Sequence, residues 1–439
     1  MKKIAIVGGG VTGLALAYYL ALEGKSVTVF EKEKNMGGLA ASFDINGVLI
    51  DKYYRHIFTS HNELLHTIDT LGLQDRLVFK KAAMAYFSQG EIHPLNSAMN
   101  LLRFKPLNFP DRLRVGLSAS AFLFKNNWES FDNLSAETYL KQKCGTRGFE
   151  TFWEPLLKNK FGNYSSCVSA AWLWDRLLSR TRSRLGKSSE SLGYLKGSFQ
   201  VLFNRMMEVI EKHGGRVLAG CPISSIEMTD DGTSSFCLNG DPGHYKYDRC
   251  IVTLPVPRFL RVAPFLPEDY RRELAQIDYA HSICMVLRLK EPLSPFYWIN
   301  IGDNFFPFAV LVEHTNWIDS DHYKGEHIVY LSQYVTSTGD DAWKAPDHVL
   351  FDIYCPFLKK IFKNFHEAQV IGFHVSRDEY TQPIFKTGYS RLLPPFAAPV
   401  NGLFLVDTSQ FYPLSRCMNT SFILAQKFTS FLAEMEKPA

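Results

Sequence analysis

The sequence predicts an α/β fold, in which a parallel sheet packed against helices is joined by an inserted domain of mixed helices and strands. Three observations support this fold class: a glycine-rich turn between an N-terminal strand and a helix, a second strand that ends in a carboxylate, and a closing apolar strand near the C-terminus. Strands that alternate with helices in this order are typical of a parallel sheet. With 439 residues, of which 46% are hydrophobic, the chain is long enough for two domains.

The N-terminal element is an apolar, β-rich run at residues 4–7, followed by the spacing G-x-G-x-x-G and a helical stretch up to Ala21. The first glycine allows a sharp turn, the second lets a pyrophosphate approach the backbone, and the third lets the helix pack closely on the sheet. Free N–H groups at the start of the helix favour phosphate binding. The residues expected to bind a dinucleotide here are Gly8, Gly10, Val11, Thr12 and Gly13.

A secretory signal peptide is the alternative interpretation of this N-terminus, because Lys2 and Lys3 precede an apolar run. A signal sequence explains neither the three spaced glycines nor the strand that ends in an acid. The glycine motif therefore favours the nucleotide-binding turn.

The second strand, residues 27–30, ends at Glu31, which lies 31 − 10 = 21 residues after Gly10. This is the spacing expected of a carboxylate that accepts hydrogen bonds from a ribose. Lys32 follows directly, and a second glycine pair comes a few residues later at Gly37-Gly38, followed by Leu39. A glycine pair lets another stretch of backbone lie against a cofactor, whereas a plain loop turn is the alternative interpretation.

This second glycine pair resembles the fingerprint of FAD-binding proteins of the amine oxidase and glutathione-reductase-2 type. The resemblance implies a Rossmann-type FAD-binding domain of the glutathione-reductase-2 type, with FAD as the cofactor. It implies cofactor contacts from the glycine turn and from Glu31, Lys32, Gly37, Gly38 and Leu39.

The C-terminal part of the chain is similar to the same superfamily. The apolar strand at residues 403–406 ends at Asp407, and the resemblance implies that this acid lies near the flavin ribityl and pyrophosphate. A helix near residues 419–421 would point its N-terminus at the pyrimidine edge of the ring, where it favours an anionic reduced flavin. Val406 and Ala425 stand where the family usually has glycine. The other cofactor contacts that the resemblance implies are Ile223, through its backbone to the adenine, Met418 and Asn419.

Two family branches compete for the function. Residues 152–162 and 192–200 look like the protoporphyrinogen oxidase and carotenoid desaturase-like branch. This implies an FAD-dependent oxidoreductase that takes a hydride to flavin N5 from a small organic substrate, either hydrophobic or amine-bearing. Residues 52–59 resemble a segment of UDP-galactopyranose mutases in which the histidine lies beside the flavin, which would mean a non-redox reaction on a nucleotide sugar. His56 is therefore the candidate catalytic residue, although a structural histidine is the alternative.

The resemblance also indicates which residues contact the substrate. Arg55, Tyr412 and Arg416 are expected there, the last two just before the final helix. The mutase alternative needs arginines to bind a diphosphate, and a solvated basic face is the other interpretation of such a run. The candidates for the diphosphate are Arg180, Arg182 and Arg184, in a run with Arg176.

The composition excludes several classes of function. The net charge of +4 is mild, so no nucleic-acid partner is expected, and the partner is a small-molecule substrate.

The eight cysteines show no metal-ligand spacing, so no metal is expected, and reduced thiols indicate a cytoplasmic protein. Cys417, just before the last helix, would be the position for a covalent flavin bond. Peripheral membrane contact stays open because several relatives take lipid-soluble substrates, and the sequence does not indicate an oligomeric state.

The domain boundaries follow from where the FAD-binding segments fall. Residues 1–80, 195–285 and 385–439 are expected to form the FAD-binding domain, and residues 81–194 and 286–384 the substrate-binding domain. The first insert looks helical, and the second contains predicted strands at residues 308–312 and 328–331. The aromatic residues at 296–308 are interpreted as core packing or as the wall of a substrate tunnel.

Overall fold

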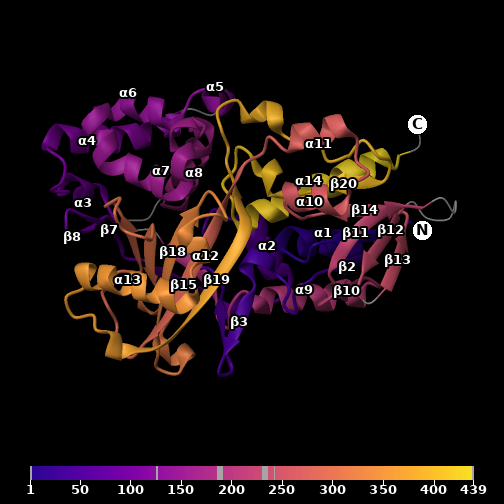
Figure 1. Cartoon of the computed structure of the whole chain (residues 1–439), viewed down its shortest axis with the longest axis horizontal. Helices are drawn as coiled ribbons and strands as arrows, with labels where there is room; N and C mark the ends of the chain where they lie inside the picture. The colour runs from indigo at the N-terminus through magenta and orange to yellow at the C-terminus, as the bar shows by residue number, and fades with distance from the viewer. Residues whose placement is uncertain (1, 125–126, 185–190, 230–235, 242, 438–439) are drawn as a thin grey trace.

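The computed structural model describes residues 2–124, 127–184, 191–229, 236–241 and 243–437. Figure 1 shows two lobes side by side: one holds the N-terminal strands and the C-terminal helix, and the other holds the helices of the first insert above a second sheet. A long strand, β19 (Val370–Pro383), runs from the second lobe to the boundary between the lobes.

The first lobe is built on a five-stranded parallel sheet with the order β10-β2-β1-β14-β20. Nearly every residue of its inner strands is buried, because helices cover both faces of a parallel sheet. Helix α1 packs against both α9 and α14. The bounds are β1 (Lys3–Val7), β2 (Ser26–Phe30), β10 (Arg216–Leu218), β14 (Arg249–Val252), β20 (Leu403–Leu405), α1 (Val11–Leu22), α9 (Gln200–Lys212) and α14 (Met418–Met435).

This sheet confirms the predicted α/β class, because the strands expected near residues 4–7, 27–30 and 403–406 all lie in it. Gly24 follows the end of α1, with φ +75° and its N–H donated to Ala21 O. Smaller elements complete the lobe. They are α2 (Asn62–Thr70), β3 (Ser42–Ile45), β4 (Val48–Asp51), β5 (Ile57–Phe58), β6 (Leu77–Lys81), β9 (Ser191–Leu195), β11 (Ile223–Met228), β12 (Phe236–Gly240), β13 (Gly243–Tyr247), α10 (Val256–Val262) and α11 (Glu268–Leu274).

The second lobe contains a seven-stranded mixed sheet with the order β19-β15-β18-β17-β16-β7-β8. Helix α13 (Asp347–Ile361) covers one face and buries its apolar side against the sheet. Phe306 and Phe308 belong to that core, which agrees with the packing interpretation for these two aromatic residues. The remaining bounds are β7 (Met84–Ser88), β8 (Glu91–Pro94), β15 (Tyr279–Leu289), β16 (Trp298–Ile301), β17 (Val310–Glu313), β18 (His327–Val335) and α12 (Asp341–Lys344).

The first insert is helical, as expected, and forms the upper part of this lobe in Figure 1. Its helices are α3 (Ala98–Leu102), α4 (Phe109–Ser120), α5 (Glu129–Asp132), α6 (Ala136–Gly148), α7 (Glu154–Phe161) and α8 (Ala170–Arg184). The division into two domains at the boundaries given above remains a prediction.

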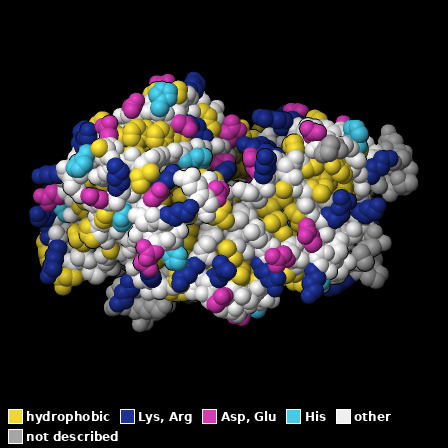
Figure 2. All heavy atoms as spheres, turned by 90° about the horizontal axis from the view of Figure 1, so that it is seen from below, with side chains coloured by type: hydrophobic (Ala, Val, Ile, Leu, Met, Phe, Trp, Pro, Cys, Tyr) yellow, Lys and Arg dark blue, Asp and Glu magenta, His cyan; other side chains and the backbone are white. Residues whose placement is uncertain are grey.

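Charged side chains are dispersed over the face in Figure 2, where Lys and Arg alternate with Asp and Glu between apolar patches. Among the described residues, no helix is both long and apolar enough to cross a membrane. The described residues also contain no group of three or more His, Cys, Asp or Glu side chains placed to hold a metal ion.

Candidate functional site

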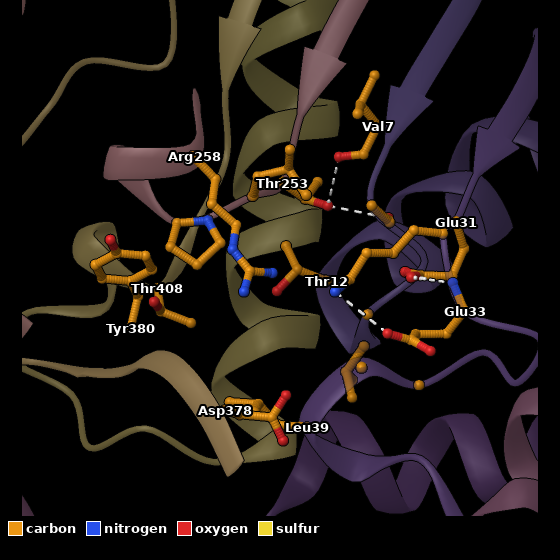
Figure 3. A pocket seen from close by; sticks show the side chains of 18 of the residues that line it. Val7, Thr12, Glu31, Glu33, Leu39, Thr253, Arg258, Asp378, Tyr380 and Thr408 are labelled. Atoms are coloured by element: carbon orange, nitrogen blue, oxygen red, sulfur yellow. Dashed lines mark hydrogen bonds and ion pairs between the residues drawn. The ribbon is translucent and has the colours of Figure 1, made fainter. Parts of the chain in front are cut away.

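A cavity of about 630 Å³ lies where the strands of the parallel sheet end. Its wall comes from the loops after β1, β2 and β14, the bulged end of β19, and the start of α14 (Figure 3). Ligands bind α/β sheets at the carboxyl ends of the parallel strands, which makes this the candidate site. Of the residues predicted to bind the cofactor or the substrate, those that line the cavity are Gly8, Gly10, Val11, Thr12, Glu31, Lys32, Gly37, Gly38, Leu39, Arg55, Ile223, Arg416 and Met418.

The three glycines of the first turn have different roles. Gly8 has φ +114° and donates its N–H to Phe30 O at 2.8 Å, which holds the sharp turn between the first two strands. A Cβ on Gly13 would lie 1.9 Å from Gly8 O, so this glycine allows α1 to pack on the turn and does not line the cavity. A Cβ on Gly10 would meet no atom within 4 Å. Gly10 therefore faces open space, as expected where a pyrophosphate approaches the backbone.

Glu31 joins the second strand to the glycine turn. Its buried carboxylate accepts hydrogen bonds from Gly9 N at 2.7 Å and from Glu33 N at 3.0 Å. A carboxylate has about four lone-pair positions, so it can also accept hydrogen bonds from a ribose. The side chain thus orders the turn as well as lining the cavity, as Figure 3 shows.

The second glycine pair lies directly against the first turn. Gly37 has φ +116° and donates its N–H to Gly9 O at 2.8 Å. A Cβ on Gly38 would lie 3.1 Å from Gly10 Cα. The pair is therefore more than a loop turn, because only a backbone without side chains allows the two segments to enclose the same space.

The acid at the end of the last strand turns away from the cavity. Asp407 is buried, and its carboxylate accepts hydrogen bonds from Ser409 N at 3.2 Å and from Tyr279 OH at 3.2 Å. It caps the short 3-10 helix Thr408–Phe411, whose first and last residues line the cavity instead. Burial raises the pKa of Asp407 to about 6. Its contact with the cofactor remains a prediction.

The start of α14 reaches the cavity through Cys417, Met418 and Ser421. Asn419 does not line it, because its side-chain oxygen accepts a hydrogen bond from Leu64 N at 3.0 Å. Burial tends to raise the pKa of the Cys417 thiol, but the neighbouring His61 lowers it to about 7 overall. The covalent flavin bond considered for Cys417 remains untested.

Two arginines predicted to contact the substrate line the cavity near α14. Arg55 donates to Leu39 O at 2.7 Å, and Arg416 donates to the side chain of Gln382 at 3.4 Å. Burial, with a further contribution from Arg416, lowers the pKa of Arg55 to about 10. The two guanidinium groups are therefore close enough to repel one another.

His56 and Tyr412 lie outside this cavity. The ring nitrogen Nδ1 of His56 lies 3.5 Å from Tyr297 OH, and its ring packs edge-on against Phe58 and Trp298. Burial, together with the nearby Arg180, lowers the pKa of His56 well below its usual value, so the ring is neutral. Tyr412 lines a second cavity of about 210 Å³ and donates to Asp132 Oδ1 at 2.6 Å. Their functional roles remain predictions.

Sequence reasoning missed several residues of the cavity wall. Thr253 follows the strand β14 and donates to Gly8 O at 3.0 Å, so its position at a strand end was a usable signal. Tyr380 has φ +55° and lies in a bulge of β19 opposite His281. The local sequence gives no signal of this bulge. The bulge turns a strand of the second lobe towards the cavity. Asp378, Arg258 and Thr408 were also missed (Figure 3).

The glycine turn, the acid after the second strand and the second glycine pair together define the class of FAD-binding α/β proteins. Residues 11–414 match the family of flavin-containing amine oxidoreductases, and the chain belongs to that family. The cofactor of this family is FAD. The match therefore confirms the predicted cofactor, fold and enzyme family. The cavity fits this group, because open space beside Gly10 and a carboxylate at Glu31 meet the needs of a pyrophosphate and a ribose.

The chain is similar to proteins of several activities. It is 24% identical to the 15-cis-phytoene desaturase of Solanum lycopersicum over 287 residues, which cover 61% of this chain and 48% of that protein. It is 38% identical to the mitochondrial protoporphyrinogen oxidase of Nicotiana tabacum over 78 residues, 18% of this chain and 16% of that protein. The matches thus span about half, or less, of the length of these curated relatives. A solved structure of reduced UDP-galactopyranose mutase has the same fold, with a TM-score of 0.76, 16% identity, and coverage of 100% of this chain and 97% of that one.

Proposed function

We propose that the chain is an FAD-dependent oxidoreductase of the oxidase or desaturase type, which takes a hydride from a small organic substrate to N5 of the flavin. The substrate is hydrophobic or amine-bearing. The observation that carries the proposal is one cavity that joins the dinucleotide turn at Gly10 to a second end at Arg55, Tyr380, Arg416 and Met418, where a substrate can enter. Bound FAD supplies the hydride acceptor.

The side chains of this site bind and orient the reactants. The N–H groups at the start of α1 and the carboxylate of Glu31 hold the ADP half of the cofactor. The N-terminus of α14, at Met418, carries a partial positive charge that stabilises negative charge at the other end of the cavity. Leu39, Met418 and Phe411 present apolar surface there, which favours a dry pocket.

Two measurements test the proposal. Cofactor released by heat and separated by chromatography should be FAD and not FMN. The FAD-loaded protein should then reduce an artificial electron acceptor, such as dichlorophenolindophenol, when hydrophobic compounds or amines are supplied. Recovery of FMN, or a protein that takes up no FAD, would contradict the cofactor site. An FAD-loaded protein that turns over none of these compounds would contradict the oxidoreductase activity.

A non-redox reaction on a nucleotide sugar is the second candidate. The specific observation in its favour is that Arg176 and Arg180 lie near His56, whose pKa both arginines lower. Arg182 is exposed, and the side chain of Arg184 lies outside the described residues. This candidate predicts that activity needs prior reduction of the flavin with dithionite and that a nucleotide sugar binds the reduced protein preferentially.

A further inference from the structure

Exposed apolar side chains form a row along α4. Phe109, Leu113 and Leu117 are each four residues apart and therefore lie on one face of the helix, where they are 57%, 43% and 67% exposed. We call these three side chains the apolar stripe. Met99, on the neighbouring helix α3, is also 54% exposed. Figure 1 shows α3 and α4 at the outer end of the second lobe, away from the first lobe. Grouped apolar exposure of this kind marks a surface that meets a partner or a membrane.

The opposite side of α4 is buried in the lobe. Its buried residues are Asp111, Val115 and Ser118, and α4 packs against α6 on this side, where a Cβ on Gly148 would lie 3.2 Å from Val115 Cγ2. The spacing of these residues places them across the helix from the apolar stripe. The stripe is therefore the outward side of a helix that the fold holds firmly.

The helix α3 is tied to the edge of α4. Arg112 donates from Nε to Leu107 O at 2.7 Å and from Nη1 to Leu102 O at 2.8 Å. A Cβ on Gly116 would lie 3.3 Å from Leu101 Cδ2, so the two helices also touch through their side chains. Because carbonyl groups are neutral, these hydrogen bonds leave the charge of Arg112 unbalanced.

Arginines border the apolar stripe on both edges. The helical repeat places Arg112 on the side of Phe109 and Arg114 on the side of Leu117, and no acid falls between them on the outward face. The stripe is thus an apolar strip with a cation along each edge.

The whole segment is basic. Residues 98–120 contain four cations, whereas their one acid is Asp111. This acid is buried and lies 3.5 Å from Arg114 Nη1 and 4.0 Å from Arg147 Nε, so its charge is already used within the fold. Among the described residues, no carboxylate forms an ion pair with Arg103 or Arg112. The surface around the stripe therefore attracts anions.

A second copy of the chain fits this surface poorly. A two-fold contact brings the same patch of both copies together, so the arginines of one copy would face those of the other. Like charges across an interface oppose association. An anionic lipid surface instead has the opposite charge, and its acyl layer accepts projecting side chains without a matching pocket. Phenylalanine and leucine on one face with basic residues at its edges are typical of helices that lie in a membrane interface.

We propose that the outer face of α4 docks the protein on a membrane surface that carries anionic lipid. The apolar stripe enters the boundary of the acyl chains, and Arg112 and Arg114 contact the headgroups. None of the residues of α3 and α4 lines either cavity described above, so docking leaves both cavities open. This inference goes beyond the proposed function, and its test needs no turnover of a substrate.

Co-sedimentation with lipid vesicles tests the proposal on the full, FAD-loaded chain. One set of vesicles contains equal parts of phosphatidylcholine and phosphatidylglycerol, and the other contains phosphatidylcholine alone. The stripe variant combines Leu113→Gln with Leu117→Gln, because glutamine keeps the helix propensity of leucine but not its apolar surface. Its matched control combines Val349→Gln with Ile353→Gln, which are also exposed and four residues apart, on α13.

A second pair of variants tests the charge. Arg114→Gln removes one cation at the edge of the stripe. Arg272→Gln is its matched control, because both arginines are exposed and both pair with an aspartate three residues earlier in a helix, Asp111 and Asp269. Thermal midpoint and FAD content show whether each variant is folded.

We expect the unchanged protein to bind the mixed vesicles more tightly than phosphatidylcholine alone, and to bind them less tightly as ionic strength rises. Loss of two apolar contacts should lower the partition coefficient of the stripe variant at least tenfold. Arg114→Gln should lower it about fivefold. Both controls should bind as the unchanged protein does.

Any of three results would overturn the inference. They are a protein that does not bind the mixed vesicles, equal binding to the two lipid compositions, and equal binding by the stripe variant and its control. Self-association that the stripe variant abolishes, without vesicle binding, would assign this face to a second copy of the chain instead.

Discussion

Gly10 and Gly13 show how residues of one motif act differently. A Cβ on Gly13 would clash with the backbone of the turn, whereas a Cβ on Gly10 would enter only the cavity. Gly10 has φ −69°, which alanine adopts without strain. The motif therefore contains one glycine that the fold requires and one that only the cofactor requires.

The substitution Gly10→Ala should separate binding from folding. The new methyl group occupies the space beside the pyrophosphate, so we expect FAD affinity to fall at least tenfold while the thermal midpoint of the protein without FAD changes little. Gly372→Ala is the matched control, because its Cβ would lie 3.7 Å from the nearest atom, Arg288 Nη1, and Gly372 does not line the cavity. A flavin titration measures the dissociation constant of each variant, and thermal unfolding without FAD measures its midpoint. An unchanged dissociation constant in Gly10→Ala would show that the pyrophosphate does not approach here.

The substitution Glu31→Ala should also weaken FAD binding at least tenfold. Hydrogen bonds to a charged group contribute about 1.5–3 kcal/mol each, and about 1.4 kcal/mol corresponds to a factor of ten. Some of the loss comes from the turn, because Gly9 N and Glu33 N lose their acceptor. Glu33→Ala is the control, since Glu33 is an exposed acid at the same wall. Equal affinities of the two variants in a flavin titration would contradict a ribose contact for Glu31.

At the scale of elements, the cap of the 3-10 helix Thr408–Phe411 makes stability depend on pH. Burial raises the pKa of Asp407 to about 6 in the folded protein, against about 3.9 in an unfolded chain. The folded state therefore binds the proton more tightly, and this group's contribution to the free energy of unfolding is full below about pH 4 and lost as the pH rises through about 6. The change is of the order of 3 kcal/mol.

Asp407→Asn should remove this pH dependence and keep the cap. The amide oxygen can still accept from Ser409 N, and the amide nitrogen can donate to Tyr279 OH. As the pH rises from 4 to 7, we expect the free energy of unfolding of the unchanged protein to fall relative to that of the variant. Denaturant titrations at several pH values measure it, and parallel pH profiles would contradict the assignment.

Local sequence predicted most of the elements that build the cofactor cavity. The strands at 4–7 and 27–30 and the helix after Gly10 follow from apolar runs and glycine spacing, which are properties of neighbouring residues. Tyr380 could not be found in this way, because a bulge in β19 and its pairing with β15 bring it to the cavity from another lobe. The same limit applies to Asn419, whose helix was predicted but whose side chain is held by Leu64 N.

At the scale of the whole molecule, the function depends on contacts between distant segments. The arginines of α8 were recognised in the sequence as a run, but the run alone cannot distinguish a solvated face from a binding site. Other cations, Arg55, Lys160 and Arg416, come from separate segments that only the fold brings near these arginines. Sequence thus predicted the cofactor and its turn, whereas the surroundings of the arginines of α8 required the tertiary structure.

Anaerobic mixing of the oxidised, FAD-loaded protein with candidate substrates tests most directly whether the chain is an oxidoreductase. The candidates are amphipathic anions, hydrophobic compounds, amines and nucleotide sugars, each with and without prior reduction by dithionite. Because hydride transfer reduces the flavin itself, a correct substrate should bleach the visible absorption of the oxidised protein without added reductant. Turnover of a nucleotide sugar only after reduction, with no compound that bleaches the oxidised flavin, would contradict the proposed function.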